Sequence, residues 1–163
     1  MGFSRKQYKN YWGSFVLDWF QYLQDYELTS ADYKTLFFLC EEMNHDNNIA
    51  YLKQKQIAEH LKMNKGNISR SIKKLSEKQF ILKCENGFMI NPHLFYVGRR
   101  GLQMRFELRD KFDTLVRGTG VTTRFDLNED DYQLEEIAVE EITDEGDSNE
   151  VMQPDNDRFK GMF

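Results

Sequence analysis

The sequence has few cysteines, few prolines and no long apolar run, which argues against disulfide-rich and membrane-spanning folds. Its 163 residues include 2 Cys and 2 Pro. No apolar run approaches the ~18 residues of a membrane-spanning helix, and we expect no secretory signal, because MGFSRKQYKN lacks an apolar core. Cys40 and Cys84 lie in apolar segments without metal-ligand spacing. We therefore expect buried free thiols in a reducing, cytoplasmic setting.

Residue patterns typical of enzymes are also missing. The sequence shows no glycine-rich phosphate loop, no cluster of metal ligands and no nucleophile paired with histidine. His45, His60 and His93 are scattered. A nicking initiator, which needs a tyrosine near a histidine-based metal site, is therefore disfavoured. We predict no catalytic residue, no metal and no cofactor.

Charge is distributed unevenly along the chain. The net charge of −5 hides two parts of opposite sign. Residues 126–163 contain 14 acids and 2 bases, a charge of −12, which leaves 20 bases and 13 acids, or +7, in residues 1–125. A basic part followed by an acidic one favours nucleic acid as a partner. We expect residues 126–163 to form a disordered acidic tail. It can contact host replication or transcription proteins, or fold back over a cationic surface and compete with DNA; a tail that only increases solubility is the equal alternative.

The first helix and the turn of a helix-turn-helix are predicted near the middle of the chain. Ile57, Ala58 and Leu61 recur at helical spacing, which predicts a helix over residues 54–61. Ala58 is small enough to let a second helix cross closely. The turn ends at Asn64, whose side chain can accept a hydrogen bond from the first turn of the next helix.

The second helix is predicted to run to about Gln79. Ile68, Ile72 and Leu75 are spaced four and then three residues apart and form its inner face. The opposite face carries cationic and amide side chains, with one acid near the far end. Such a face suits the major groove of DNA, where the N-terminal side chains of a helix reach base edges.

Each polar residue of that face has a predicted role on duplex DNA. Arg70 can fork onto a guanine edge, and Asn67 can pair with an adenine edge. Lys62, Lys73 and Lys74 are expected to contact phosphates, which position the protein without reading sequence. A solvated basic face is the alternative, but the spacing, the cap and the hairpin below all agree with DNA binding. The predicted DNA-binding set is Lys62, Asn64, Lys65, Asn67, Ser69, Arg70, Lys73, Lys74 and Lys83.

A β-hairpin is predicted after the second helix. Two apolar runs, 80–84 and 88–90, flank residues 85–87, which read Glu-Asn-Gly. Asn-Gly is the preferred pair of a type I′ turn, because both positions need positive φ. Lys83 is the one cation of this wing, and Glu85 would repel phosphate. The wing is therefore expected to position the helix rather than to read bases.

Three further segments complete the predicted fold. Thr29, with Asp32 three residues later, begins a supporting helix whose inner residues are Tyr33, Leu36, Phe37, Leu39, Cys40 and Met43. Residues 14–26 place Phe15, Trp19 and Tyr22 on one stripe, which predicts a largely buried helix. Residues 102–116 fit a strand or a helix, and their composition favours the helix. Such an extra helix can form a homodimer interface, with a monomer as the equal alternative.

The stretch from about residue 15 to residue 98 resembles the firmicute plasmid replication proteins of the RepL type, which are winged-helix proteins. The residues that carry the resemblance are IAYLKQKQIAEHLKMNKGNISRSIKKLSEKQFILK, the hairpin around ENG, and MINPHLFYVG. The first piece is shared with many winged-helix regulators, and the last is the more specific. Many repressors of the multiple-antibiotic-resistance class have Gly where this chain has Gln79. The resemblance implies recognition of a plasmid or phage origin.

These patterns predict a mainly α fold with a small β-hairpin wing (α+β). We expect an N-terminal arm and helix (1–28), a winged helix-turn-helix DNA-binding domain (29–98), a C-terminal helix or extension (99–125) and the acidic tail (126–163). The predicted function is sequence-specific binding of double-stranded DNA by a replication initiator at its origin. A transcriptional regulator is the first alternative, and an adaptor acting through the acidic tail is the second.

Overall fold

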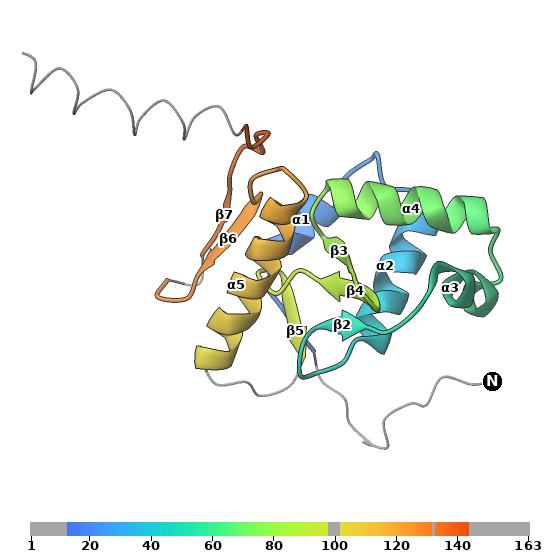
Figure 1. Ribbon diagram of the computed structural model, residues 1–163, viewed down its shortest axis with the longest axis horizontal. Helices are drawn as coiled ribbons and strands as arrows, with labels where there is room; N and C mark the ends of the chain where they lie inside the picture. Colours follow the sequence, from blue (N-terminus) through green and yellow to red (C-terminus); the bar gives the residue numbers. More distant parts are fainter. Residues whose placement is uncertain (1–12, 98–101, 132, 144–163) are drawn as a thin grey trace, which may run out of the picture.

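A layer of three helices packed on a three-stranded sheet forms the centre of the fold in the computed structural model (Figure 1). The structure describes residues 13–97, 102–131 and 133–143. In chain order the elements are β1 (Gly13–Phe15), α1 (Trp19–Leu23), α2 (Ser30–Glu42), β2 (Ile49–Ala50), α3 (Gln54–Leu61), α4 (Lys65–Glu77), β3 (Ile81–Cys84), β4 (Gly87–Ile90), β5 (Phe95–Val97), α5 (Leu102–Gly118), β6 (Phe125–Asn128) and β7 (Gln133–Glu136). The order α2-β2-α3-α4-β3-β4, with strands arranged β2-β4-β3, confirms the predicted winged helix-turn-helix.

The sheet is buried on both faces, which explains why β4 is apolar throughout. One face packs against α2, α3 and α4. The other face, with Leu82 and Met89, packs against Leu108, Phe112 and Val116 of α5. Successive side chains of a strand point to opposite faces, so a strand covered twice needs apolar residues at every position. The prediction of a helix over residues 102–116 is confirmed.

Helix α2 begins at the predicted capping box. The Thr29 hydroxyl accepts a hydrogen bond from the Asp32 N–H (3.3 Å), and Asp32 Oδ2 accepts one from the Thr29 N–H (2.8 Å). One inner residue was predicted wrongly, because Phe37 is 50% exposed and its neighbour Phe38 is buried. Phe38, Leu39 and Cys40 are all buried, so the buried side of α2 includes Phe38 rather than Phe37, and the sequence alone did not decide between the two phenylalanines.

Residues 14–26 do not form the predicted buried helix. β1 pairs antiparallel with β5, and only Trp19–Leu23 is helical. Phe15 stacks on Phe95 across the two strands, with ring centroids 4.3 Å apart. The partner strand lies about 80 residues away along the chain, and such distant pairing overrides a local helical stripe.

The wing has a different turn from the predicted one. Cys84 pairs with Gly87, so the turn residues are Glu85 and Asn86. Neither has positive φ, and Gly87 is the first residue of β4. Glycine is needed there for another reason: a Cβ at Gly87 would lie 2.1 Å from the carbonyl oxygen of Ala50 in the neighbouring strand β2.

The prediction of a disordered tail from Asp126 is wrong for the described residues up to 143. They complete a two-stranded ribbon, residues 121–142, in which β6 pairs with β7 and Val121 forms a bridge with Glu141. Phe125, Leu127 and Leu134 join the main core. At the tip, Glu129 accepts two hydrogen bonds from Arg105 (2.8 Å each) and pairs with Arg109 (2.8 Å), so ion pairs connect the ribbon to α5.

Two predicted features lie outside the described residues: the N-terminal arm and the last 20 residues of the acidic segment. Among the helices that are described, none has the length and apolar character needed to cross a membrane. The described residues also contain no group of three or more His, Cys, Asp or Glu placed to hold a metal ion.

Candidate nucleic-acid interface

The turn between α3 and α4 sets how the two helices cross. Lys62 has the left-handed conformation (φ 53°) and ends α3, and the Met63 N–H donates to the Ala58 carbonyl (2.9 Å). Asn64 Oδ1 accepts from the Gly66 N–H (2.6 Å), so the predicted cap is confirmed. Ala58 is buried beneath the crossing. This crossing turns one side of α4 inward and the other outward.

The outward side of α4 is open to solvent. Ile68, Ile72 and Leu75 are buried as predicted, and the polar residues Lys65, Asn67, Ser69, Arg70 and Lys73 are exposed. Lys62 and Asn64 are exposed beside the start of the helix. In Figure 1, α4 runs along the upper edge of the molecule, and α5, β6 and β7 lie to its left. Within the described part of the chain, these side chains are therefore open to solvent, as contact with a duplex requires.

The two predicted base-reading side chains contact each other. The Arg70 guanidinium donates a hydrogen bond to Asn67 Oδ1, one helical turn earlier. Both side chains are exposed. Their donors and acceptors therefore lie side by side on α4, in the part that would meet base edges first.

Asp32 connects α2 to the buried side of α4. Its side chain is 3% exposed. Asp32 Oδ1 accepts from the Ser71 hydroxyl (2.7 Å), and Oδ2 accepts from Lys74 Nζ (2.8 Å). We call Asp32, Ser71 and Lys74 the Asp32 cluster. Because a buried carboxylate requires such donors, the cluster fixes the middle of α4 against the start of α2.

Lys74 is therefore placed differently from the other predicted phosphate contacts. Its ammonium group pairs with Asp32 and donates to the Glu27 carbonyl (3.0 Å). Burial alone would raise the pKa of Asp32, but hydrogen bonds from Lys74, Thr29 and Ser71 outweigh it and lower the pKa. Moving Lys74 to a phosphate would leave this carboxylate without its cation. We assign Lys74 to the support of α4 rather than to its exposed face.

The C-terminal end of α4 is also neutralised. Lys78 Nζ pairs with Asp25 (2.6 Å) and Glu27 (3.0 Å) in the loop before α2. Burial would lower the pKa of Lys78, but the two carboxylates raise it. The uncompensated positive charge of α4 therefore lies on its first two and a half turns, where Lys65, Arg70 and Lys73 are exposed.

Comparison with known families agrees with this geometry. Residues 26–81 match a family model described as a helix-turn-helix domain. The protein contains a helix-turn-helix domain. No curated protein matches the chain, and no solved structure does either. The helix-turn-helix domain suggests sequence-specific DNA binding, and α4 is its second helix, which in such domains is called the recognition helix.

The wing adds little charge to the helix-turn-helix domain. Lys83 is exposed on β3, and Glu85 is exposed in the turn. Lys53 and Lys55, which the sequence analysis did not select, are exposed at the start of α3. These lysines precede or follow the recognition helix in the sequence. None of them is on the helix that would enter the groove, so they suit contacts with phosphates rather than with bases.

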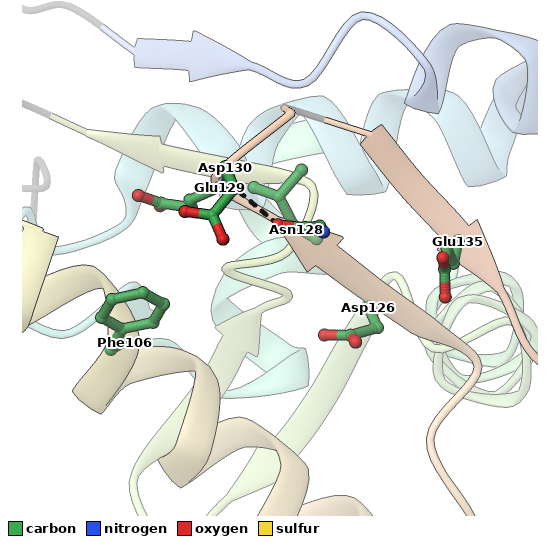
Figure 2. A pocket seen from close by; sticks show the side chains of 7 residues that line it. Phe106, Asp126, Asn128, Glu129, Asp130 and Glu135 are labelled. Carbon is green, nitrogen blue, oxygen red and sulfur yellow. Dashed lines mark hydrogen bonds between the residues drawn. The ribbon is translucent and has the colours of Figure 1, made fainter.

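A hollow on the other side of the molecule has the opposite charge. Its volume is about 260 Å³, and Figure 2 shows its lining between α5 and the β6–β7 hairpin. The residues that line it are Phe106, Asp126, Leu127, Asn128, Glu129, Asp130 and Glu135. Glu129 is paired with Arg105 and Arg109, and the remaining carboxylates of the hollow, Asp126, Asp130 and Glu135, would repel the DNA backbone.

Sequence reasoning missed the residues that hold the recognition helix in place. Ser71 lies three residues after Ile68, at inner-face spacing, and this is the one signal that marked it as buried. Asp32 was recognised only as a capping residue. Lys78 and Gln79 were not predicted to hold the helix, because their partners come from segments that are distant along the chain.

Proposed function

We propose that this protein acts by binding duplex DNA sequence-specifically through the recognition helix α4, and not as an enzyme. The observation that carries the proposal is the exposed face of Lys65, Asn67, Ser69, Arg70 and Lys73 on a helix whose inner side is held by the Asp32 cluster. Arg70 and Asn67 are the base-reading residues. Lys62, Lys65 and Lys73 contact phosphates.

The proposed biological role is replication initiation at a plasmid or phage origin. It is supported by the resemblance of residues 15–98 to RepL-type proteins, above all by the segment MINPHLFYVG. That segment includes β5 and the turn before it, which pack on the core rather than on the DNA face. A transcriptional regulator would use the same face of α4, so the location of the DNA site separates the two roles.

Selection from a pool of random duplexes tests the proposal most simply. The wild-type chain should enrich one short motif, and the motif should then be searched for in the DNA around its own gene. Footprinting inside a replication origin supports the initiator, and protection of a promoter supports the regulator. Enrichment of no motif at all contradicts sequence-specific binding.

A cellular test separates DNA binding from the adaptor alternative. The double change Arg70→Ala and Lys73→Ala should abolish replication or regulation, because it removes a base contact and a phosphate contact. Lys111→Ala, which removes an exposed cation from α5, is the matched control and should leave function intact. Full activity of the double variant would favour an adaptor acting through the acidic segment.

A further inference from the structure

The recognition helix ends in an unusual residue. Gln79, two residues after α4, has the left-handed conformation (φ 58°) and is 4% exposed. Residues other than glycine seldom adopt this backbone conformation. A helix commonly ends in glycine there, because glycine has no Cβ to clash. The glutamine side chain must therefore contribute something that glycine cannot.

That contribution is a pair of hydrogen bonds to the C-terminal ribbon. Gln79 Nε2 donates to the Thr122 carbonyl (2.9 Å), and the Arg124 N–H donates to Gln79 Oε1 (2.8 Å). The side-chain amide thus satisfies two backbone groups of the ribbon, as a neighbouring strand would. The main chain of Gln79 is held as well, because Asn91 Nδ2 donates to its carbonyl (2.8 Å).

Arg124 completes the contact from the ribbon side. Its guanidinium donates to the Lys78 carbonyl (3.0 Å), which caps the end of α4, and pairs with Glu136 of β7 (3.0 Å). It also lies over the ring of Phe125, 4.7 Å from the centroid. The bond to the Lys78 carbonyl connects the ribbon to the end of the recognition helix, and the contacts with Glu136 and Phe125 hold the Arg124 side chain within the ribbon.

We propose that Gln79 is a positioning residue, through which the C-terminal ribbon sets the angle of the recognition helix; this inference rests on the proposed function. The Asp32 cluster fixes α4 near Ser71, and Gln79 supplies a second fixed point about 12 Å further along. Without the Gln79 side chain, this end of α4 keeps the ion pairs of Lys78 and the Arg124 bond to the Lys78 carbonyl but loses its two bonds to the ribbon backbone, which lets the helix tilt. A tilt of about 10° about Ser71 moves the backbone at Lys65 by roughly 1.5 Å, enough to misalign a hydrogen bond to a base edge.

The test uses Gln79→Gly in the full chain. Glycine accepts the backbone conformation, so the change removes the two ribbon bonds without adding strain. The probes are a duplex that the wild-type chain recovers from a random pool and a scrambled duplex of the same composition. Gln79→Gly should lose at least about tenfold in affinity for the recovered duplex, the factor that one misaligned base contact costs, and less than about twofold for the scrambled one.

Leu134→Ala is the matched control. Leu134 is buried in β7, so its truncation destabilises the ribbon while leaving the Gln79 bonds in place. Binding is measured at a temperature where circular dichroism shows that both variants are folded. Leu134→Ala should keep the wild-type ratio of the affinity for the recovered duplex to that for the scrambled duplex. An unchanged ratio for Gln79→Gly, or an equal fall for Leu134→Ala, would overturn the inference.

A second variant covers the case in which Gln79→Gly does not fold. Gln79→Glu keeps the length of the side chain and the acceptor for the Arg124 N–H, but loses the donor to Thr122. It also places a second carboxylate oxygen against the Thr122 carbonyl, which repels it, so the ratio of the affinities for the recovered and scrambled duplexes should fall at least as far as for Gln79→Gly. A ratio identical to that of wild type would overturn the inference. If the wild-type chain recovers no duplex, the proposed function itself fails, which is a distinct result.

Discussion

Removing the Asp32 carboxylate should destabilise the fold more than its position near a helix terminus suggests. Asp32→Ala leaves the buried Ser71 hydroxyl without its acceptor, which costs about 1–2 kcal/mol. It also removes half of the capping box of α2, worth about 0.5–1 kcal/mol. The pair with Lys74, whose side chain is 34% exposed, adds about 0.5–1 kcal/mol. The expected loss is therefore about 2–4 kcal/mol in the free energy of unfolding.

Urea unfolding measures this loss directly, with equal slopes for variant and wild type as the check on two-state behaviour. Asp130→Ala is the control, because Asp130 is exposed and forms no ion pair within the described part of the chain. It should change the stability by less than about 0.5 kcal/mol. A loss below about 1 kcal/mol for Asp32→Ala would refute the view that the cluster supports α4.

The same carboxylate makes the stability depend on pH. The folded-state pKa of Asp32 lies below its ordinary value, as do those of Asp25 and Glu129. Between the folded-state pKa and the unfolded value of about 3.9 for aspartate, the unfolded chain binds more protons, so stability rises with pH. The contribution is complete above about pH 4–5 and is lost as the pH falls. Asp32→Asn should show a shallower loss between pH 5 and pH 3.

Three further predictions concern other parts of the molecule. Lys73→Ala should weaken binding to all duplexes and lower the slope of log K against log salt by about one unit, measured by fluorescence anisotropy; an unchanged slope would remove Lys73 from the phosphate contacts. Gly87→Ala should lower the free energy of unfolding by about 2–4 kcal/mol, measured by thermal unfolding, because its Cβ would lie 2.1 Å from the Ala50 oxygen. The control Gly118→Ala should be neutral or stabilising, because nothing lies within 4 Å of the added Cβ. Burial raises the pKa of Cys40 to about 12, so a thiol reagent should modify Cys84 and leave Cys40 unmodified until the protein unfolds; rapid reaction of both thiols would contradict the burial of Cys40.

The helix-turn-helix was predictable because its signals are local. The spacing of Ile57, Ala58 and Leu61, the Asn64 cap and the inner stripe of α4 all follow from residues within one or two helical turns of each other. The capping box at Thr29 belongs to the same class. In each case the sequence pattern and the fold obey the same short-range geometry.

The features that were mispredicted depend on distant partners. Phe125 and Leu127 alternate with polar residues as a strand pattern requires, but the surrounding acids suggested disorder. Packing of these two residues and of Leu134 against the core overrides that composition. Gly87 was assigned to the turn because Asn-Gly favours one. Glycine is needed at this position because the backbone of the neighbouring strand β2 lies too close for a Cβ atom. The Asp32 cluster joins residues about 40 positions apart, which no local pattern reveals.

The most direct test of the central claim is the base preference of Arg70→Ala, measured by repeating the selection from random duplexes with this variant. The account predicts a motif that has lost its preference at one base position, with a cost of about 1–3 kcal/mol on the wild-type site and little change on unrelated DNA. An equal loss of affinity on the selected site and on random DNA would show that Arg70 reads no base, and would contradict the assignment of α4 as the recognition helix.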